Sequence, residues 1–176
     1  MEMTPAELGE SLAQLVWESF TDFIAAHEMP EDEAGGDTIV LTAPEVVPEE
    51  VLILFMWVHT RACQQAFNGR ATAEALKSVL DQFHAAVFQD LQDEIMPRAQ
   101  LPIFEQRVSA RYTEYYEAAS RNADQRVVEV AARRVTPDSR ALSTISLELA
   151  EATAATSGPL RDFLEDVDIA SLDDGD

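Results

Sequence analysis

The most apolar stretch of the chain is the run VLILFMWV at positions 51–58. A membrane-spanning helix needs about 20 largely apolar residues, whereas polar residues return here after eight. Pro48 suits the first turn of a helix, and Asn68 with Gly69 suits its end. The pattern therefore predicts a buried helix at about 48–67 in the core of a globular fold, and no membrane span.

Amphipathic segments on both sides of this run predict further helices. Thr4, Pro5 and Glu7 form a strong helix start, with a hydroxyl cap, a proline in the first turn and a glutamate three residues after the cap. Apolar residues then recur every three or four positions along the chain. The predicted helices span about 5–27, Thr72 to about Met96, a segment from about Phe104 to Val135 that reads as one bent helix or two, and Thr136 to about Ala155.

Acidic residues, prolines and glycines mark the breaks between these helices. Residues 28–47 lack helical periodicity and hold six acids and no base, which predicts a long acidic connection with a short extended piece at Thr38–Leu41. The Ser-Gly-Pro run at 157–159 predicts a break before a short final helix, and Ala170–Asp176 reads as a disordered acidic tail. We expect one all-α domain at 1–169, an antiparallel bundle of roughly five to seven helices around a buried central helix.

The charge of the chain is strongly acidic and unevenly distributed. The 176 residues carry 33 acids against 12 bases, a net charge of −21. Residues 1–60 hold 13 acids and no Lys or Arg, whereas residues 98–140 hold eight arginines against six acids. Because such a surface repels phosphates, direct binding of nucleic acid is not expected. High acidity with Lys77 as the only lysine fits either a high-salt cytoplasm, as in a halophile, or a GC-rich genome.

Motifs that would identify a reaction or a cofactor are missing from the sequence. Cys63 is the only cysteine, which excludes an intrachain disulfide and a zinc site built from several cysteines. There is no phosphate-binding glycine loop, nucleophile elbow or internal repeat. No basic N-terminal region precedes an apolar segment, as a secretory signal requires, so we expect a cytoplasmic location.

Four residues of metal-ligand type are expected near one another where two helices join through a short turn. If the turn is centred near 69–71, His59 lies level with Asp81 and His84, and Cys63 shares the face of His59. Histidine, carboxylate and thiolate can bind zinc or another transition metal between helices. The favoured alternative is a core histidine bonded to Asp81 or to a carbonyl, with Cys63 as a small buried hydrophobe and no cofactor.

Tyrosine and arginine gather in one stretch of the second half of the chain. These residue types are enriched at binding hot spots, so the stretch predicts a surface for a protein partner or for a second copy in a homodimer. The alternative is that the tyrosine rings pack within the fold and expose their hydroxyls. The residues are Arg107, Arg111, Tyr112, Tyr115 and Tyr116. The arginines further along could hold an anionic ligand or the protein's own acidic loop and tail, and charge compensation within the chain is favoured. They are Arg126, Arg133, Arg134 and Arg140.

Two classes of function remain after these exclusions. The favoured one is a non-enzymatic helical protein that binds a partner or itself, as an adaptor, an assembly factor or a regulator. Its support is the acidic connection and tail, the arginine-rich second half and the lack of catalytic motifs. The alternative is a helical protein that binds a small molecule or a metal, with or without enzymatic activity, at a polar site between the second and third helices.

Overall fold

The computed structural model describes residues 1–28, 43–120 and 124–170. Within them the chain forms six α-helices and one pair of two-residue strands, which confirms the predicted all-α class. The predicted extended piece at Thr38–Leu41 lies outside the described residues, as do most of the acidic connection and all of the acidic tail after Ala170. Among the helices described, none is both long enough and apolar enough to cross a membrane.

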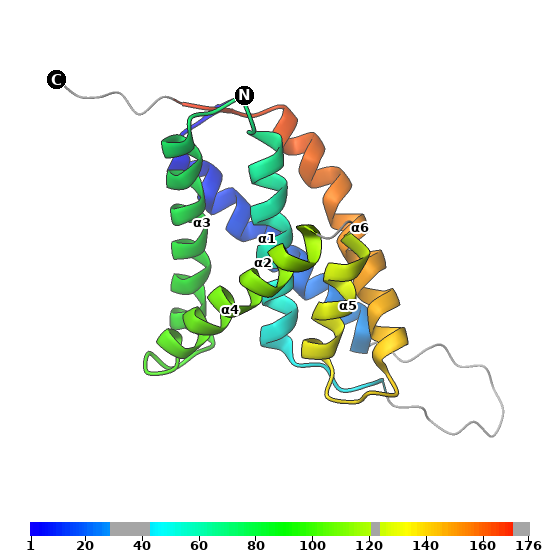
Figure 1. Ribbon diagram of the computed structural model, residues 1–176. Helices are drawn as coiled ribbons and strands as arrows, with labels where there is room; N and C mark the ends of the chain where they lie inside the picture. The colour runs from blue at the N-terminus through cyan, green and yellow to red at the C-terminus, as the bar shows by residue number, and fades with distance from the viewer. Residues whose placement is uncertain (29–42, 121–123, 171–176) are drawn as a thin grey trace.

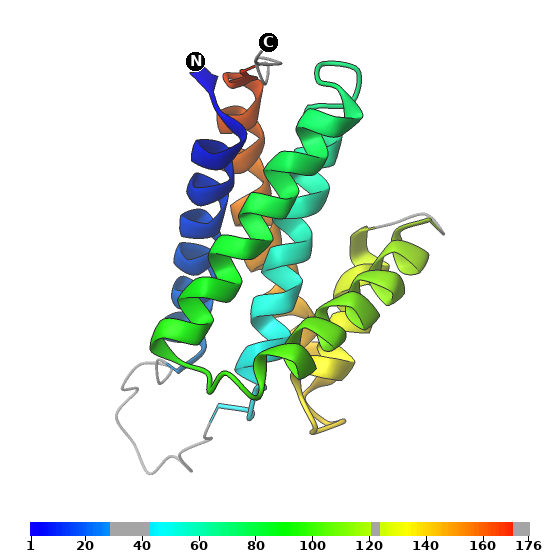
Figure 2. The same ribbon diagram turned by 90° about the vertical axis from the view of Figure 1, so that its left-hand side faces the viewer.

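The helices follow the predicted order with some changes in their bounds. Figure 2 shows α4 and α5 together on one side of the other four helices, and Figure 1 shows α1 crossing α2 and α3 at an angle. The segment predicted as one bent helix or two is two helices, α4 and α5. In chain order the helices are α1 (Pro5–Glu28), α2 (Pro48–Ala66), α3 (Ala73–Glu94), α4 (Leu101–Ser120), α5 (Asp124–Val135) and α6 (Leu142–Glu165), as labelled in Figure 1.

Local signals set several of these helix ends. At the start of α1 the Glu7 side chain accepts from the Thr4 amide at 2.8 Å, and the Thr4 hydroxyl accepts from the Glu7 amide at 3.3 Å. This reciprocal pair is the predicted capping box, and its hydrogen bonds lower the pKa of the Glu7 carboxyl. Thr72 caps α3 by accepting from the Ala75 amide. Gly69, in the turn before it, has a φ of +77°, which glycine adopts without steric penalty.

Two predicted boundaries of α6 are wrong. The helix begins at Leu142 and not at Thr136, because residues 136–141 form a turn in which the Asp138 carboxylate accepts from the Arg140 amide at 2.9 Å. The helix also continues through Pro159 to Glu165. The turns around the proline are held in place because Leu160 and Leu164 are buried in the core, and this packing outweighs the hydrogen bond that proline removes.

Helix α2 is buried on all sides over much of its length. Every residue from Glu50 to Thr60 is buried, and the helix contacts each of the other five. Helix α3, although joined to α2 by a short turn, packs most closely against α1. At that contact a β-carbon on Gly9 would lie 2.7 Å from Cβ of Gln82 and 2.8 Å from the amide nitrogen of Phe83. Glycine therefore lets the two backbones approach closely.

A short parallel strand pair joins the beginning and the end of the described chain. Strand β1 (Glu2–Met3) pairs with β2 (Asp168–Ile169), and the two lie side by side at the top of Figure 1. Arg70, just after α2, donates to the carbonyls of Leu164, Glu165 and Val167 at 2.8–3.1 Å. These contacts fix the end of α6, and the hydrophobic periodicity of the sequence does not predict them.

Candidate functional site

His59 is a buried histidine with one nitrogen left free. Its Nδ1 lies 2.8 Å from the Phe55 carbonyl oxygen, and since a carbonyl only accepts, Nδ1 carries the proton. Nε2 is then an acceptor, and it has no hydrogen-bond partner among the described residues. The ring is 1 % exposed, and this burial lowers its pKa to about 4. At neutral pH His59 therefore offers one buried lone pair.

His84 joins three helices through a chain of hydrogen bonds. Its Nδ1 donates to the Leu80 carbonyl at 2.6 Å, so its Nε2 accepts from the Tyr112 hydroxyl at 2.9 Å. The Tyr112 oxygen in turn accepts from the Thr60 hydroxyl at 3.1 Å. Burial lowers the pKa of His84 and raises that of Tyr112. The chain is neutral and internally satisfied, and it ties α2, α3 and α4 together.

The four predicted metal ligands do not form one cluster. Cys63 is buried, which raises the pKa of its thiol to about 12, and Asp81 is exposed and pairs with Lys77. In the part of the chain that the structure describes, no three His, Cys, Asp or Glu side chains are placed to hold one metal ion. Metal binding at His59, Cys63, Asp81 and His84 stays a prediction, without a preassembled site to support it.

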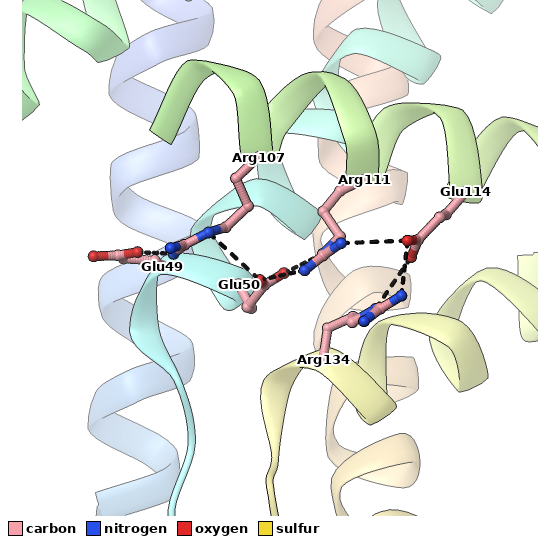
Figure 3. A network of polar contacts seen from close by, with 6 residues as sticks. All are labelled: Glu49, Glu50, Arg107, Arg111, Glu114 and Arg134. Carbon is pink, nitrogen blue, oxygen red and sulfur yellow. Dashed lines mark hydrogen bonds and ion pairs between the residues drawn. The ribbon is translucent and has the colours of Figure 1, made fainter. Parts of the chain in front are cut away.

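The predicted arginine cluster takes part in an ion-pair network inside the fold (Figure 3). Arg111 holds Glu50 with two hydrogen bonds, Nε to Oε2 at 2.8 Å and Nη2 to Oε1 at 2.9 Å. Arg107 pairs with Glu49. Glu114 extends the network to Arg134 of α5 at 2.8 Å. Acids at the start of α2 are therefore neutralised by arginines of α4. Arg134 pairs with an acid of α4, and among the described residues it forms no ion pair with the predicted acidic loop or tail.

The predicted tyrosine cluster is also used within the fold. Tyr115 is fully buried, with its ring centre 5.8 Å from that of Trp57. The Tyr116 hydroxyl donates to Gln64 at 2.9 Å, and Tyr112 belongs to the His84 chain. The rings pack as the alternative expects, but the hydroxyls of Tyr112 and Tyr116 bind side chains of α2 and α3. Partner binding at this cluster stays a prediction.

A cleft of about 870 Å³ lies between α1 and α6, with His59 of α2 in its lining. We call it the acidic cleft. Its apolar wall includes Phe23 and Phe163, and its lining holds no Lys or Arg among the described residues. His27 pairs with one acid of the lining, Glu148, at 2.7 Å. The remaining acids of the lining are Glu18, Asp22 and Glu151.

Hydrogen-bond acceptors dominate the polar lining of the acidic cleft. The hydroxyls of Ser11, Ser19 and Thr156 donate their protons to carbonyls of their own helices at 2.8–3.0 Å, which leaves their oxygens as acceptors. Ala155 and Pro159 both line the cleft. Because Pro159 has no amide hydrogen, the Ala155 carbonyl lacks its usual helical donor. The lining thus contains hydrogen-bond acceptors of α1 and α6, and His59 of α2 lies beside them.

Sequence reasoning singled out His59 but missed the rest of this site. The acidic residues of the lining are ordinary solvent-facing positions of amphipathic helices, and only the packing of α1 beside α6 makes them neighbours. One signal was available, the small and hydroxylated run from Ala152 to Gly158, because small side chains leave space beside a helix. Comparison with protein-family models, with curated proteins and with solved structures finds no match for this chain.

Proposed function

We propose that the protein binds a small amphipathic cation in the acidic cleft. The observation that carries this proposal is the free Nε2 of His59, a buried acceptor whose role is fixed by the bond from Nδ1 to Phe55. A buried polar atom without a partner costs free energy, and a ligand N–H or O–H group would remove that cost. The ligand should therefore carry a hydrogen-bond donor.

The charge of the acidic cleft determines which class of hydrogen-bond-donating ligand is favoured. With Glu148 paired to His27, the carboxylates of Glu18, Asp22 and Glu151 remain in a lining without Lys or Arg, as far as the structure describes it. These carboxylates favour an ammonium group over a neutral alcohol and disfavour a carboxylate. The rings of Phe23 and Phe163 add apolar surface and attract cations through their faces.

The size of the cleft fits a small organic ligand. Its volume of about 870 Å³ falls within the range of roughly 300–1,000 Å³ that small-molecule sites occupy. Its mix of apolar walls with a few convergent polar groups is also typical of such sites. The proposal concerns binding, and the ligand class is an alkyl- or arylammonium ion.

Calorimetric titration with 2-phenylethylammonium at pH 7.5 tests the proposal. We expect it to bind more tightly than 2-phenylethanol, and phenylacetate to bind weakest, because the three share a skeleton and differ in the polar group. His59→Phe should weaken ammonium binding about tenfold, the effect of one buried hydrogen bond. Equal binding of phenylacetate, or unchanged affinity in the variant, would overturn the proposal.

A matched pair of charge variants checks the location of the site. Glu151→Gln removes an acid of the cleft, whereas Glu129→Gln removes an exposed acid of α5 that is not in the lining. Both lower the net negative charge equally. Weaker ammonium binding only in Glu151→Gln supports the acidic cleft, and equal weakening would mean that the whole acidic surface attracts the ligand.

Binding of a protein partner or of a second copy is a separate prediction from the sequence. The internal contacts of Arg111 and Tyr115 do not favour α4 as an interface, so the geometry supports ligand binding better. Sedimentation equilibrium at micromolar concentration separates a monomer of 19.5 kDa from a dimer of twice that mass. A dimer that persists in Arg107→Glu would exclude an interface built on that arginine.

A further inference from the structure

We infer that a second cleft, on the other side of α6, binds an amphipathic carboxylate. This cleft measures about 820 Å³ and lies between α2, α5 and α6. We call it the arginine cleft, after Arg61 and Arg161 in its lining. Residues 148, 152, 155, 159 and 163 of α6 line the acidic cleft, and residues 150, 154, 157, 161 and 165 line the arginine cleft. The spacing of three or four places the two sets on different faces of one helix.

The arginine cleft has the opposite charge preference. Arg61 and Arg161 lie in its lining with a single acid, Glu165. Arg107 and Arg111 are held by carboxylates, whereas Arg61 and Arg161, like Arg126 and Arg133, form no ion pair among the described residues. Arg61 and Arg161 differ from Arg126 and Arg133 in that they line this cleft. In a chain with a net charge of −21, two guanidinium groups left for a ligand favour an anion. Guanidinium groups bind carboxylates with two parallel hydrogen bonds.

Trp57 supplies an independent observation that points to a ligand. It lines the arginine cleft and is 4 % exposed, and its Nε1 has no hydrogen-bond partner in the described part of the chain. An indole N–H only donates, so only an acceptor can satisfy it. His59, in the lining of the acidic cleft, has an unpaired acceptor, and Trp57, in the lining of the arginine cleft, has an unpaired donor. This difference matches the charge of each lining.

The rest of the lining favours a ligand with an apolar body. Ala62, Ala66 and Ala150 of the lining are only partly buried, so the cleft keeps accessible apolar surface. A β-carbon built on Gly158 meets no atom within 4 Å, so the wall of the cleft is open at that position. An inorganic anion would leave this apolar surface unused, whereas a fatty-acid-like carboxylate would cover it while its head group meets the arginines.

Titration with decanoate, below its micellar concentration, tests this inference. The Trp17→Phe background leaves Trp57 as the only tryptophan, so its emission reports on the arginine cleft while calorimetry gives the affinity. We expect decanoate to bind and to shift the emission of Trp57. Arg61→Gln and Arg161→Gln should each weaken binding about tenfold, and Gly158→Phe should block it by filling the open wall.

Control variants separate the two clefts and guard against misfolding. Arg133→Gln changes an exposed arginine of α5 outside the lining and should leave decanoate binding unchanged, as should His59→Phe. Arg161 and Gly158 are exposed, so their variants should fold. Decylammonium binding as tightly as decanoate, unchanged affinity in both arginine variants, or loss of decanoate binding in His59→Phe would each overturn the inference. Failure of 2-phenylethylammonium to bind in the acidic cleft would overturn the proposed function but not this inference.

Discussion

A single backbone contact decides what the buried imidazole of His59 can bind. The Phe55 carbonyl fixes the proton on Nδ1, so Nε2 keeps a lone pair that a donor must satisfy. In His84 the same type of contact, to Leu80, leaves Nε2 as the acceptor of the Tyr112 hydroxyl. The two histidines thus have the same tautomer. Nε2 of His84 is satisfied within the fold, whereas Nε2 of His59 has no hydrogen-bond partner among the described residues.

We expect His59 to reduce the stability of the fold in mild acid. Burial lowers its folded-state pKa from 6.5 to about 4, so between these values the unfolded chain binds more protons and the free energy of unfolding falls as the pH falls. The loss between pH 7 and pH 4 should be about 3 kcal/mol. Urea denaturation across this range, compared with His59→Phe, isolates the contribution. If the free energy of unfolding fell equally with pH in the wild type and in His59→Phe, the predicted contribution of His59 would be contradicted.

The ion pairs of α4 predict very different effects for two neighbouring arginines. The side chains of Arg111 and Glu50 are 16 % and 7 % exposed, whereas those of Arg107 and Glu49 are 34 % and 42 % exposed. Arg111→Ala removes both hydrogen bonds of the buried Glu50 and leaves only the longer contact to Arg107 at 4.0 Å, which should lower the free energy of unfolding by about 3–5 kcal/mol. Arg107→Ala should lower it by about 0–1 kcal/mol. Chemical denaturation of both variants checks this ranking, and similar losses would refute it.

At the residue scale, the sequence placed side chains on helix faces but did not assign their partners. It placed His59 among apolar neighbours and allowed a carbonyl as its partner, which is what the structure shows. It proposed Arg111 for a partner surface and did not foresee its hydrogen bonds to Glu50, which lies 61 positions away in the chain. Helical periodicity reports the burial of a face, and it contains no information on which distant residue lies opposite.

At the scale of whole helices, the sequence predicted most of the helices correctly but misplaced some of their ends. The capping box at Thr4 and the glycine at position 69 act through neighbouring residues, so their effects were predictable. The start of α6 was misplaced because Thr136 and Asp138 make the same kind of local bonds in a turn as at a helix cap. The continuation through Pro159 depends on long-range packing, which local signals do not contain.

The close contact of α1 and α3 predicts a glycine requirement at position 9. Alanine normally favours a helix over glycine by about 1 kcal/mol, but a β-carbon here would lie 2.7 Å from Cβ of Gln82. Moving the helices apart should cost more, so Gly9→Ala should lower the free energy of unfolding by about 1–3 kcal/mol.

Gly158→Ala is the matched control for this substitution. Position 158 also lies within a helix, but a β-carbon there meets nothing within 4 Å. The usual advantage of alanine over glycine in a helix is offset here, because Pro159 follows and disfavours the helical conformation of a residue with a β-carbon. We therefore expect the free energy of unfolding to change by no more than about 0.5 kcal/mol. Thermal unfolding of the two variants side by side measures the contrast, and a stabilising Gly9→Ala would show that the helices separate freely.

At the scale of the whole molecule, the distribution of charge links the fold to the two clefts. Arginines of α4 and α5 neutralise acids inside the fold, as Arg111 and Arg134 do with Glu50 and Glu114. The excess of acids therefore remains largely at the surface and in the acidic cleft. Arg61 and Arg161 form no ion pair among the described residues, and both line the arginine cleft. The sequence shows that acidic and basic residues are concentrated in different segments. Which of them line each cleft depends on how α6 packs against the other helices, and the sequence does not show this packing.

The same excess of acids predicts that salt stabilises the fold. Folding brings a net charge of −21 into a small volume, and the Debye length shrinks from about 10 Å at 0.1 M to about 3 Å at 1 M salt. Screening should relieve this repulsion, while the buried pair of Arg111 and Glu50 is screened much less than exposed charges. The exposed pair of Lys77 and Asp81 contributes little to stability in any case. We therefore expect the melting temperature to rise with sodium chloride.

Replacing surface acids by neutral residues should reproduce part of this effect and separate it from other actions of salt. Glu10, Glu105 and Glu129 are exposed acids on three different helices, and changing all three to Gln removes three negative charges without touching the core. The variant should melt at a higher temperature than the wild type in low salt, and its melting temperature should rise less between low and molar sodium chloride. Circular dichroism at 222 nm, the standard wavelength for helices, follows both transitions. A flat or falling response in the wild-type protein would mean that the ion pairs within the fold outweigh the repulsion among its surface acids.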